Sequence, residues 1–192
     1  ISIGGQSDIV LSHAHFARSS SAEPLLRSTN SAFMATLSII SSKFTDSASH
    51  CIELQGSIEL NIEDVETSNC NSDALWVQSS LLAIDGMVAE DTIRISGVEG
   101  EIHDLVGTDV VVNNVDGFTM SGLTLQSISG SDNRELNIHD ATITGAPAID
   151  LDNTAGDLSN LAIDCGGSGT GLTAHHGRAS SSIIVSESTI TS

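Results

Sequence analysis

Several residue types are rare in this chain, and their scarcity excludes whole classes of protein. Tyr is absent, aromatic residues make up 3% of the 192 residues, and Pro occurs twice. Lys and Arg number 6 against 25 Asp and Glu, which gives a formal net charge of −19. Because phosphate backbones and anionic lipid heads repel such a chain, we expect no nucleic-acid partner. No apolar run approaches the roughly 20 residues of a membrane span, so we expect no membrane insertion.

The residues that are present favour an all-β core over a helix bundle. Ser, Thr, Gly and Asp are abundant, whereas the Glu, Lys, Gln and Arg residues that usually cover helix surfaces are few. Apolar residues make up 39% of the chain and charged residues only 16%, which argues against a disordered acidic tail. With so few aromatic residues, the core must be built from Ile, Leu, Val and Ala in thin layers.

A short pattern recurs along the chain and predicts a solenoid of stacked units. In each copy an aliphatic anchor is followed by two residues, an aliphatic or small residue, one more residue and another aliphatic or small residue. The anchors are Ile62, Ile84, Ile102, Met120, Ile138, Leu158 and Val185, with a looser copy at Ile40 and a fainter one at Leu11.

The third residue of each copy marks a bend between two short strands. It is Asp64, Gly86, Asp104, Gly122, Asp140, Asn160 or Glu187, mostly residue types that tolerate a left-handed backbone. Apolar and polar residues then alternate with the period of a strand, and another short strand precedes most anchors. Such a unit cannot bury its own apolar face, but stacked units can if each strand pairs in parallel with its equivalent one turn away.

The repeat therefore predicts an all-β fold, a parallel β-helix of about 7–9 turns that forms one domain over residues 1–192. We expect irregular first turns or a cap over residues 1–36, including a loop at 17–36, and regular turns over 37–192. Ile93, Ile95, Ile102 and Leu105 are expected to point into the core. The pattern resembles the right-handed, pectate-lyase-like β-helix superfamily, closely over residues 35–192 and weakly over 1–34. This resemblance implies a right-handed coil and polysaccharide sites on an exposed sheet.

Outward positions of the earlier strand in each unit line up into a polar stripe. A sugar ring stacks on Trp, and planar polar groups satisfy its hydroxyls, so the stripe would suit a polysaccharide. The competing interpretation is that exposed strand positions are polar in any sheet. The candidate ligand-binding residues are Trp76, Gln78, Arg94, Asn113, Asp150, Asp152 and His175.

Arg94, Asp150 and Asp152 are the candidate catalytic residues on the stripe. The two aspartates share a strand face, with carboxylates within roughly 7 Å, which is compatible with glycoside hydrolysis or, with Asn153, with a Ca²⁺ site. They are equally compatible with plain surface acids. Arg94 is expected to have no acidic neighbour on the adjacent turns, which makes a weak lyase site.

The stretch from His175 to Arg178 is faintly similar to the Gly-His-Gly of polygalacturonase-like β-helix hydrolases. The Asn-Thr-Asp triplet and Asp-Asp pair of those enzymes are absent, so their catalytic roles cannot be carried over.

Three cysteines leave two interpretations open. Cys51 and Cys70 lie 19 residues apart (70 − 51), close to one turn, so they form either a disulfide or two buried small hydrophobic side chains. Cys165 stays single. The cysteine spacing fits no zinc site. The sequence establishes no cofactor, and Ca²⁺ is a candidate.

Two functions of different classes remain in view. The first is an extracellular or cell-surface β-helix with a structural, adhesive or glycan-contacting role, and the second is a polysaccharide lyase or glycoside hydrolase. The acidic composition and the single lysine, Lys43, favour a secreted or cell-surface location. The chain begins at Ile1 without Met, and its last repeat is in register without a cap. We therefore expect either a longer parent chain or end-to-end self-association into a filament.

Overall fold

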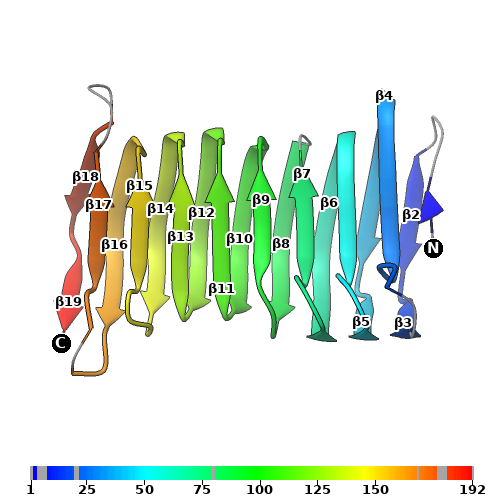
Figure 1. Ribbon diagram of the computed structural model, residues 1–192, viewed down its shortest axis with the longest axis horizontal. Coiled ribbons are helices and arrows are strands. Elements are labelled where there is room, and N and C mark those ends of the chain that lie inside the picture. Colours follow the sequence, from blue (N-terminus) through cyan, green and yellow to red (C-terminus); the bar gives the residue numbers. More distant parts are fainter. Residues whose placement is uncertain are drawn as a thin grey trace.

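Parallel strands coil around one long axis in the computed structural model of this chain. The structure describes residues 2–3, 8–19, 22–78, 81–167, 169–176 and 181–191, and within them all side chains except those of 2, 3, 19, 29–35 and 57. The strands run across the long axis, and the two termini lie at its opposite ends (Figure 1). The predicted all-β parallel solenoid is confirmed. The described residues include no helix long and apolar enough to cross a membrane.

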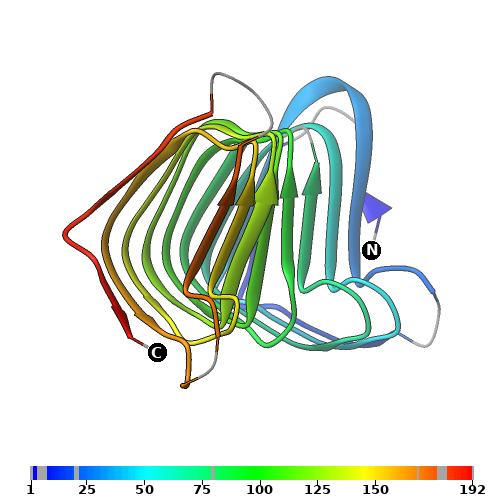
Figure 2. The same ribbon diagram turned by 60° about the vertical axis from the view of Figure 1, so that its left-hand side comes forward.

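Three ladders of strands form three faces around the core, as the turned view shows (Figure 2). The first, which we call the stripe face, contains β1 (Ser2–Ile3), β7 (Leu75–Gln78), β9 (Ile93–Ser96), β11 (Asp109–Asn113), β13 (Ser127–Ser131), β15 (Ile149–Asp152), β17 (Leu172–His175) and the first residues of β4 (Leu26–Ile40) and β6 (Ile52–Cys70).

The second ladder, the anchor face, carries the repeat anchors. It contains β2 (Ile9–Ser12), the later residues of β4, the middle of β6, and the first halves of β8 (Leu81–Ala89), β10 (Glu99–Gly107), β12 (Asp116–Leu125), β14 (Arg134–Ile143) and β16 (Gly156–Asp164), followed by β18 (Ile183–Ser186). The third ladder, the return face, contains β3 (His15–Ser19), β5 (Lys43–Ser47) and β19 (Thr189–Thr191). The C-terminal parts of β6, β8, β10, β12, β14 and β16 complete it.

The predicted anchors pair with one another in register through the whole anchor face. Ile62 pairs with Ile84, Ile84 with Ile102, and the ladder continues through Met120, Ile138, Leu158 and Val185. The looser copy was placed one residue too late, because Ile39, not Ile40, pairs with Ile62. A shift of one residue moves a side chain to the opposite face of a strand, so Ile39 is buried while Ile40 is only partly buried.

The structure has about six regular turns, fewer than the seven to nine expected. They start at Ile52, Leu75, Ile93, Val110, Ile128 and Ile149, which pair in succession on the stripe face. The turn that starts at Ile128 has no counterpart in the predicted stripe. Its strand β13 reads Ser-Ile-Ser-Gly-Ser and offers a single large apolar residue, so the sequence pattern there is weak.

The irregular segment expected at 17–36 is narrower in the structure. Residues 15–19 form β3, and β4 pairs with β6 from Leu26 to Asn30 and again from Ala35 to Ile40. Residues 22–25, with Pro24, connect β3 to β4 outside any strand, and a second irregularity lies inside β4, where the register shifts between Asn30 and Ala35.

Left-handed bends separate the anchor face from the return face. All seven predicted bend residues have positive φ, among them Asp64 at 52°, Gly86 at 74° and Asp104 at 53°. Gly86 and Gly122 suit the left-handed backbone, and Oδ1 of Asp64 and of Asp104 on the preceding turns lies close to where their Cβ atoms would stand. A side chain is also accommodated at this position, since Asn160 follows Asp140 and its amide contacts Oδ1 of that acid.

A disulfide joins Cys51 and Cys70 at the corner between the return face and the stripe face. Their Cα atoms are 5.5 Å apart, and Cys165 is buried as a free thiol. Of the two interpretations that the sequence left open, the structure shows the disulfide. It closes a loop of 19 residues, for which loss of chain entropy alone predicts a stabilisation of about 3 kcal/mol.

Each turn adds one aliphatic layer to the core, so we expect a charged side chain at Ile102 to prevent folding. Ile93, Ile95, Ile102 and Leu105 are all inward, each with at most 1% exposure. Ile102→Asp places a carboxylate between Ile84 and Met120, at a cost of several kcal/mol against a marginal total stability. We expect circular dichroism to show no cooperative thermal transition.

The matched control is Val106→Asp in the same strand, because Val106 is 48% exposed. We expect it to melt within a few degrees of the unchanged protein. A cooperative Ile102→Asp protein with a similar melting temperature would contradict the inward assignment.

Candidate functional site

The outward side chains of the stripe face form two parallel rows. One row runs through Arg27, Glu53, Trp76, Arg94, Val111, Ser129, Asp150 and Thr173, and the other through Gln55, Gln78, Ser96, Asn113, Ser131, Asp152 and His175. All predicted ligand-binding residues lie in these rows. The predicted set divides into an N-terminal group, Trp76, Gln78 and Arg94, and a C-terminal group, Asn113, Asp150, Asp152 and His175, which line one hollow together with Ser129 of β13.

Trp76 is the centre of the N-terminal group. Its side chain is partly buried, and the centroid of its indole lies 5.1 Å from that of His50, with the rings inclined by 37°. Glu53 pairs with it on the preceding turn and Arg94 on the following turn. An aromatic surface with charged and planar polar groups on both sides is therefore present on the stripe.

Asp73 connects the polar groups around Trp76, and the sequence analysis missed it. Its side chain is only 9% exposed and accepts hydrogen bonds from Nε and Nη2 of Arg94, both at 3.4 Å. Its backbone N–H donates to Nδ1 of His50 at 3.3 Å, and its Oδ2 lies 3.2 Å from the same nitrogen. The expectation that Arg94 has no acidic neighbour is thus wrong. Asp73 precedes strand β7 (Leu75–Gln78) by two residues and therefore lies outside the strand pattern of the repeat.

Glu53 is a second buried carboxylate beside Trp76. Its side chain is 6% exposed and lies 3.4 Å from Nη2 of Arg27, and Gln55 donates a hydrogen bond of 3.0 Å to its Oε1. Arg27 also pairs with exposed Glu23 at 2.8 Å. Each buried carboxylate of this group is therefore compensated by an arginine, which leaves the surroundings of the indole close to neutral.

The C-terminal group lines an open hollow of about 280 Å³. Asn113, Asp150, Asp152 and His175 contribute to it, and Asp152 pairs with His175 across β15 and β17. Asn113 is held by hydrogen bonds from the backbone N–H and the hydroxyl of Ser131, at 3.0 and 3.1 Å to its Oδ1. Four of the predicted residues are thus brought together, while Trp76, Gln78 and Arg94 lie on turns nearer the N-terminus.

The Ca²⁺ candidates Asp150, Asp152 and Asn153 occupy one strand end. Asn153 takes a left-handed bend, with φ of 47°, and its N–H donates to the carbonyl of His175 at 2.8 Å. Within the described part of the chain, no group of three or more His, Cys, Asp or Glu side chains is placed to hold a metal ion. The Ca²⁺ site stays a prediction. Gly177 and Arg178 of the His-His-Gly-Arg stretch lie outside the described residues.

His103 and His139 on the anchor face each contact polar side chains next to them and not one another. Nε2 of His103 lies 3.3 Å from Glu101, and its Nδ1 contacts the hydroxyl of Ser121, which separates it from His139 in the ladder. A shared zinc site between the two histidines is not expected at this separation.

The carboxylate of Asp140 has a perturbed pKa. His139 Nδ1 lies 2.9 Å from its Oδ2, and the Asn160 amide contacts Oδ1. These hydrogen bonds, that of His139 first, lower the pKa of Asp140 from its ordinary value of 3.8.

Comparisons with known proteins give no relative for this chain. No family model, no curated protein sequence and no solved structure matches it. Its function therefore has to be argued from its own residues.

The Asp140 cluster gives a prediction on pH. Because the pKa of Asp140 is lower in the folded state, its ionised form favours folding at pH values above the ordinary carboxyl pKa. That contribution is lost as the pH falls through the lowered value. We expect His139→Ala to raise the pKa of Asp140 toward 3.8 in a titration followed by carboxyl ¹³C NMR.

His103→Ala is the matched control, since His103 lies two turns away on the same face. It should leave the titration of Asp140 unchanged. An Asp140 titration that is the same in His139→Ala and in the unchanged protein would refute the assigned cause.

Proposed function

We propose that this protein is an extracellular or cell-surface β-helix of the right-handed, pectate-lyase-like type, and that its stripe face contacts a glycan while the solenoid serves as a rigid scaffold. The observation that carries the proposal is the group around Trp76. A partly exposed indole lies beside His50 and Arg94, and buried Asp73 holds both of them. Stacking on an aromatic face and hydrogen bonds from planar groups are the interactions that sugar rings make.

The Cys51–Cys70 disulfide supports the proposed location. Disulfides persist in oxidising compartments and are rare where glutathione keeps thiols reduced. The acidic composition, with a net charge of −19 and a single lysine, Lys43, agrees with an extracellular setting.

A second candidate function is cleavage of the polysaccharide at the C-terminal group. It is favoured by the hollow that Asp150, Asp152 and His175 share, since paired carboxylates can act as acid and base. Arg94 does not belong to this hollow and is ion-paired with Asp73, so a lyase mechanism that uses Arg94 as its base has no support.

End-to-end assembly is part of the same proposal. At the C-terminal end, Val185 and Ile190 continue the core ladders from Leu158 and Ile163. They are 44% and 49% exposed, whereas their partners on the preceding turn are buried. Such an apolar layer with an open strand edge is covered either by a further turn of a longer parent chain or by another copy, for which it is a template.

Trp76→Ala tests the glycan-contacting role. We expect the unchanged protein to bind members of a panel of neutral, anionic and cationic oligosaccharides in titration calorimetry. Trp76→Ala should weaken the binding at least about tenfold, as expected for a central aromatic contact. Trp76→Phe should retain part of the affinity, and Val88→Ala, an exposed apolar residue on the return face, should retain all of it.

The same incubations separate the two functions. Release of reducing ends or unsaturated products that Asp152→Asn abolishes would establish the enzyme in place of the binding module. Absence of binding by the whole panel would refute the glycan-contacting role.

Sedimentation velocity of the 192-residue chain tests the assembly. We expect the mean sedimentation coefficient to rise with concentration, because the exposed layer at Val185 and Ile190 is apolar. Ile190→Glu should abolish the rise, since it places a charge in the layer that must be desolvated. Val106→Glu, on a side of the solenoid, is the matched control and should not change the rise. A monomer at every concentration would contradict end-to-end assembly.

A further inference from the structure

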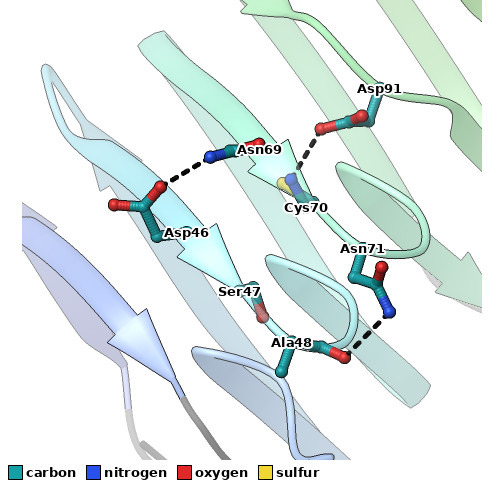
Figure 3. A pocket seen from close by; sticks show the side chains of 7 residues that line it. All are labelled: Asp46, Ser47, Ala48, Asn69, Cys70, Asn71 and Asp91. Carbon is teal, nitrogen blue, oxygen red and sulfur yellow. Dashed lines mark hydrogen bonds between the residues drawn. The ribbon is translucent and has the colours of Figure 1, made fainter.

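An open hollow lies around the corner from Trp76, where the return face turns toward the stripe face. Its volume is about 600 Å³, within the range of small-molecule sites. Figure 3 shows the side chains of Asp46, Asn69, Asn71 and Asp91 around it, contributed by β5, β6 and the loops that follow β6 and β8.

Hydrogen bonds fix the polar side chains of this hollow before any ligand binds. Asn69 Nδ2 donates to Oδ1 of Asp46 at 2.8 Å, and Oδ2 of Asp91 accepts from the backbone N–H of Cys70 at 2.7 Å (Figure 3). Asn71 Nδ2 lies 3.4 Å from the carbonyl of Ala48. Carboxylate and amide groups have further lone pairs and N–H bonds beyond these contacts. Groups held in this way lose little freedom when a ligand binds.

The backbone around the hollow is equally constrained. Asp46 and Asn69 take left-handed bends, with φ of 58° and 59°. Cys70 is tied by its disulfide to Cys51.

The charges of the hollow select the class of ligand. None of its lining residues is basic, and Asp46 and Asp91 are carboxylates in a chain of net charge −19. An anionic ligand would be repelled, whereas hydroxyl groups can donate to the carboxylates and to the amide oxygens. The charges therefore argue against an anionic ligand. Among neutral and cationic ligands, the amide groups of Asn69 and Asn71 favour one rich in hydroxyl groups, because an amide can both donate to and accept from a hydroxyl.

The hollow and the Trp76 group are built by the same three passes of the chain. Ala48 precedes His50 by two residues, Asn71 precedes Asp73 by two, and Asp91 precedes Arg94 by three. Two residues span at most about 7 Å of chain and three at most about 11 Å, so each pass places one residue in the hollow and another in the Trp76 group within a short step.

We infer that the hollow is a second sugar subsite, and that the ligand of this protein is a neutral oligosaccharide with one ring on Trp76 and the next units bonded to Asp46, Asn69, Asn71 and Asp91. This inference rests on the glycan-contacting function proposed above. It adds the class of ligand and the direction in which it runs, from Trp76 across the corner to the hollow.

Ligand length and a blocking variant test the inference. Calorimetry would compare neutral glucan, mannan and xylan oligosaccharides, from disaccharide to hexasaccharide, with oligogalacturonates and chitosan oligomers. We expect a neutral series to bind best, with affinity at least about tenfold higher for the hexasaccharide than for the disaccharide. Raising the NaCl concentration should leave that affinity unchanged, because the ligand carries no charge.

Ala48→Arg fills the hollow from an exposed position and can pair with Asp46 and Asp91. It should remove the gain with length and leave disaccharide binding intact, while Trp76→Ala weakens both. Thr142→Arg adds the same group at an exposed site of β14 and should change neither. A gain with length that survives Ala48→Arg, or stronger binding of the anionic or cationic series, would overturn the second subsite and leave the glycan-contacting function standing. No binding by any series would overturn both.

Discussion

Parallel pairing of each strand with its equivalent one turn later is the interaction on which the rest of this structure depends. It places the side chains of successive turns directly above one another, so that every position of the repeat becomes a row. Inward rows form the aliphatic core, and outward rows form the surfaces. Each turn contributes one residue to a row. Residues far apart in the sequence, such as Glu53, Trp76 and Arg94, therefore lie side by side.

The left-handed bends keep this register, and the sequence marks them well. A residue with positive φ after each anchor turns the chain between two faces, and side chains of the acid and amide type recur there. Side chains at the bends also touch between turns, since the amide of Asn160 contacts Oδ1 of Asp140 on the preceding turn. Local backbone preference and packing between turns thus require the same residues, as expected for a sequence that specifies one fold.

The ladders could be predicted from the sequence because they repeat, and the features that were missed are those that do not. The seven regular anchors pair as expected, whereas the looser copy at Ile40 is off by one residue, and the rows of the stripe face pair as expected except where β13 is inserted. Strand β13 was missed because Ile128 is its single large apolar residue. Asp73 was missed because it reaches Arg94 from a loop, by its side chain and not by strand register. The disulfide could be named only as one of two alternatives, since a separation of 19 residues leaves the meeting of the two cysteines open.

The distribution of ion pairs separates the group around Trp76 from the rest of the surface. Lys43–Glu66 and Arg134–Asp116 join side chains that are all at least 49% exposed, and such pairs contribute little to stability. Arg27 and Arg94 instead pair with carboxylates of Glu53 and Asp73 that are 6% and 9% exposed. Burying a charge costs free energy that its partner recovers only in part, and an apolar residue of similar size would often serve stability better. Departures from the simplest packing tend to occur where a protein has a function. The retention of two buried, arginine-compensated carboxylates beside the only tryptophan of the chain is therefore an argument for recognition, and a weak one for stability.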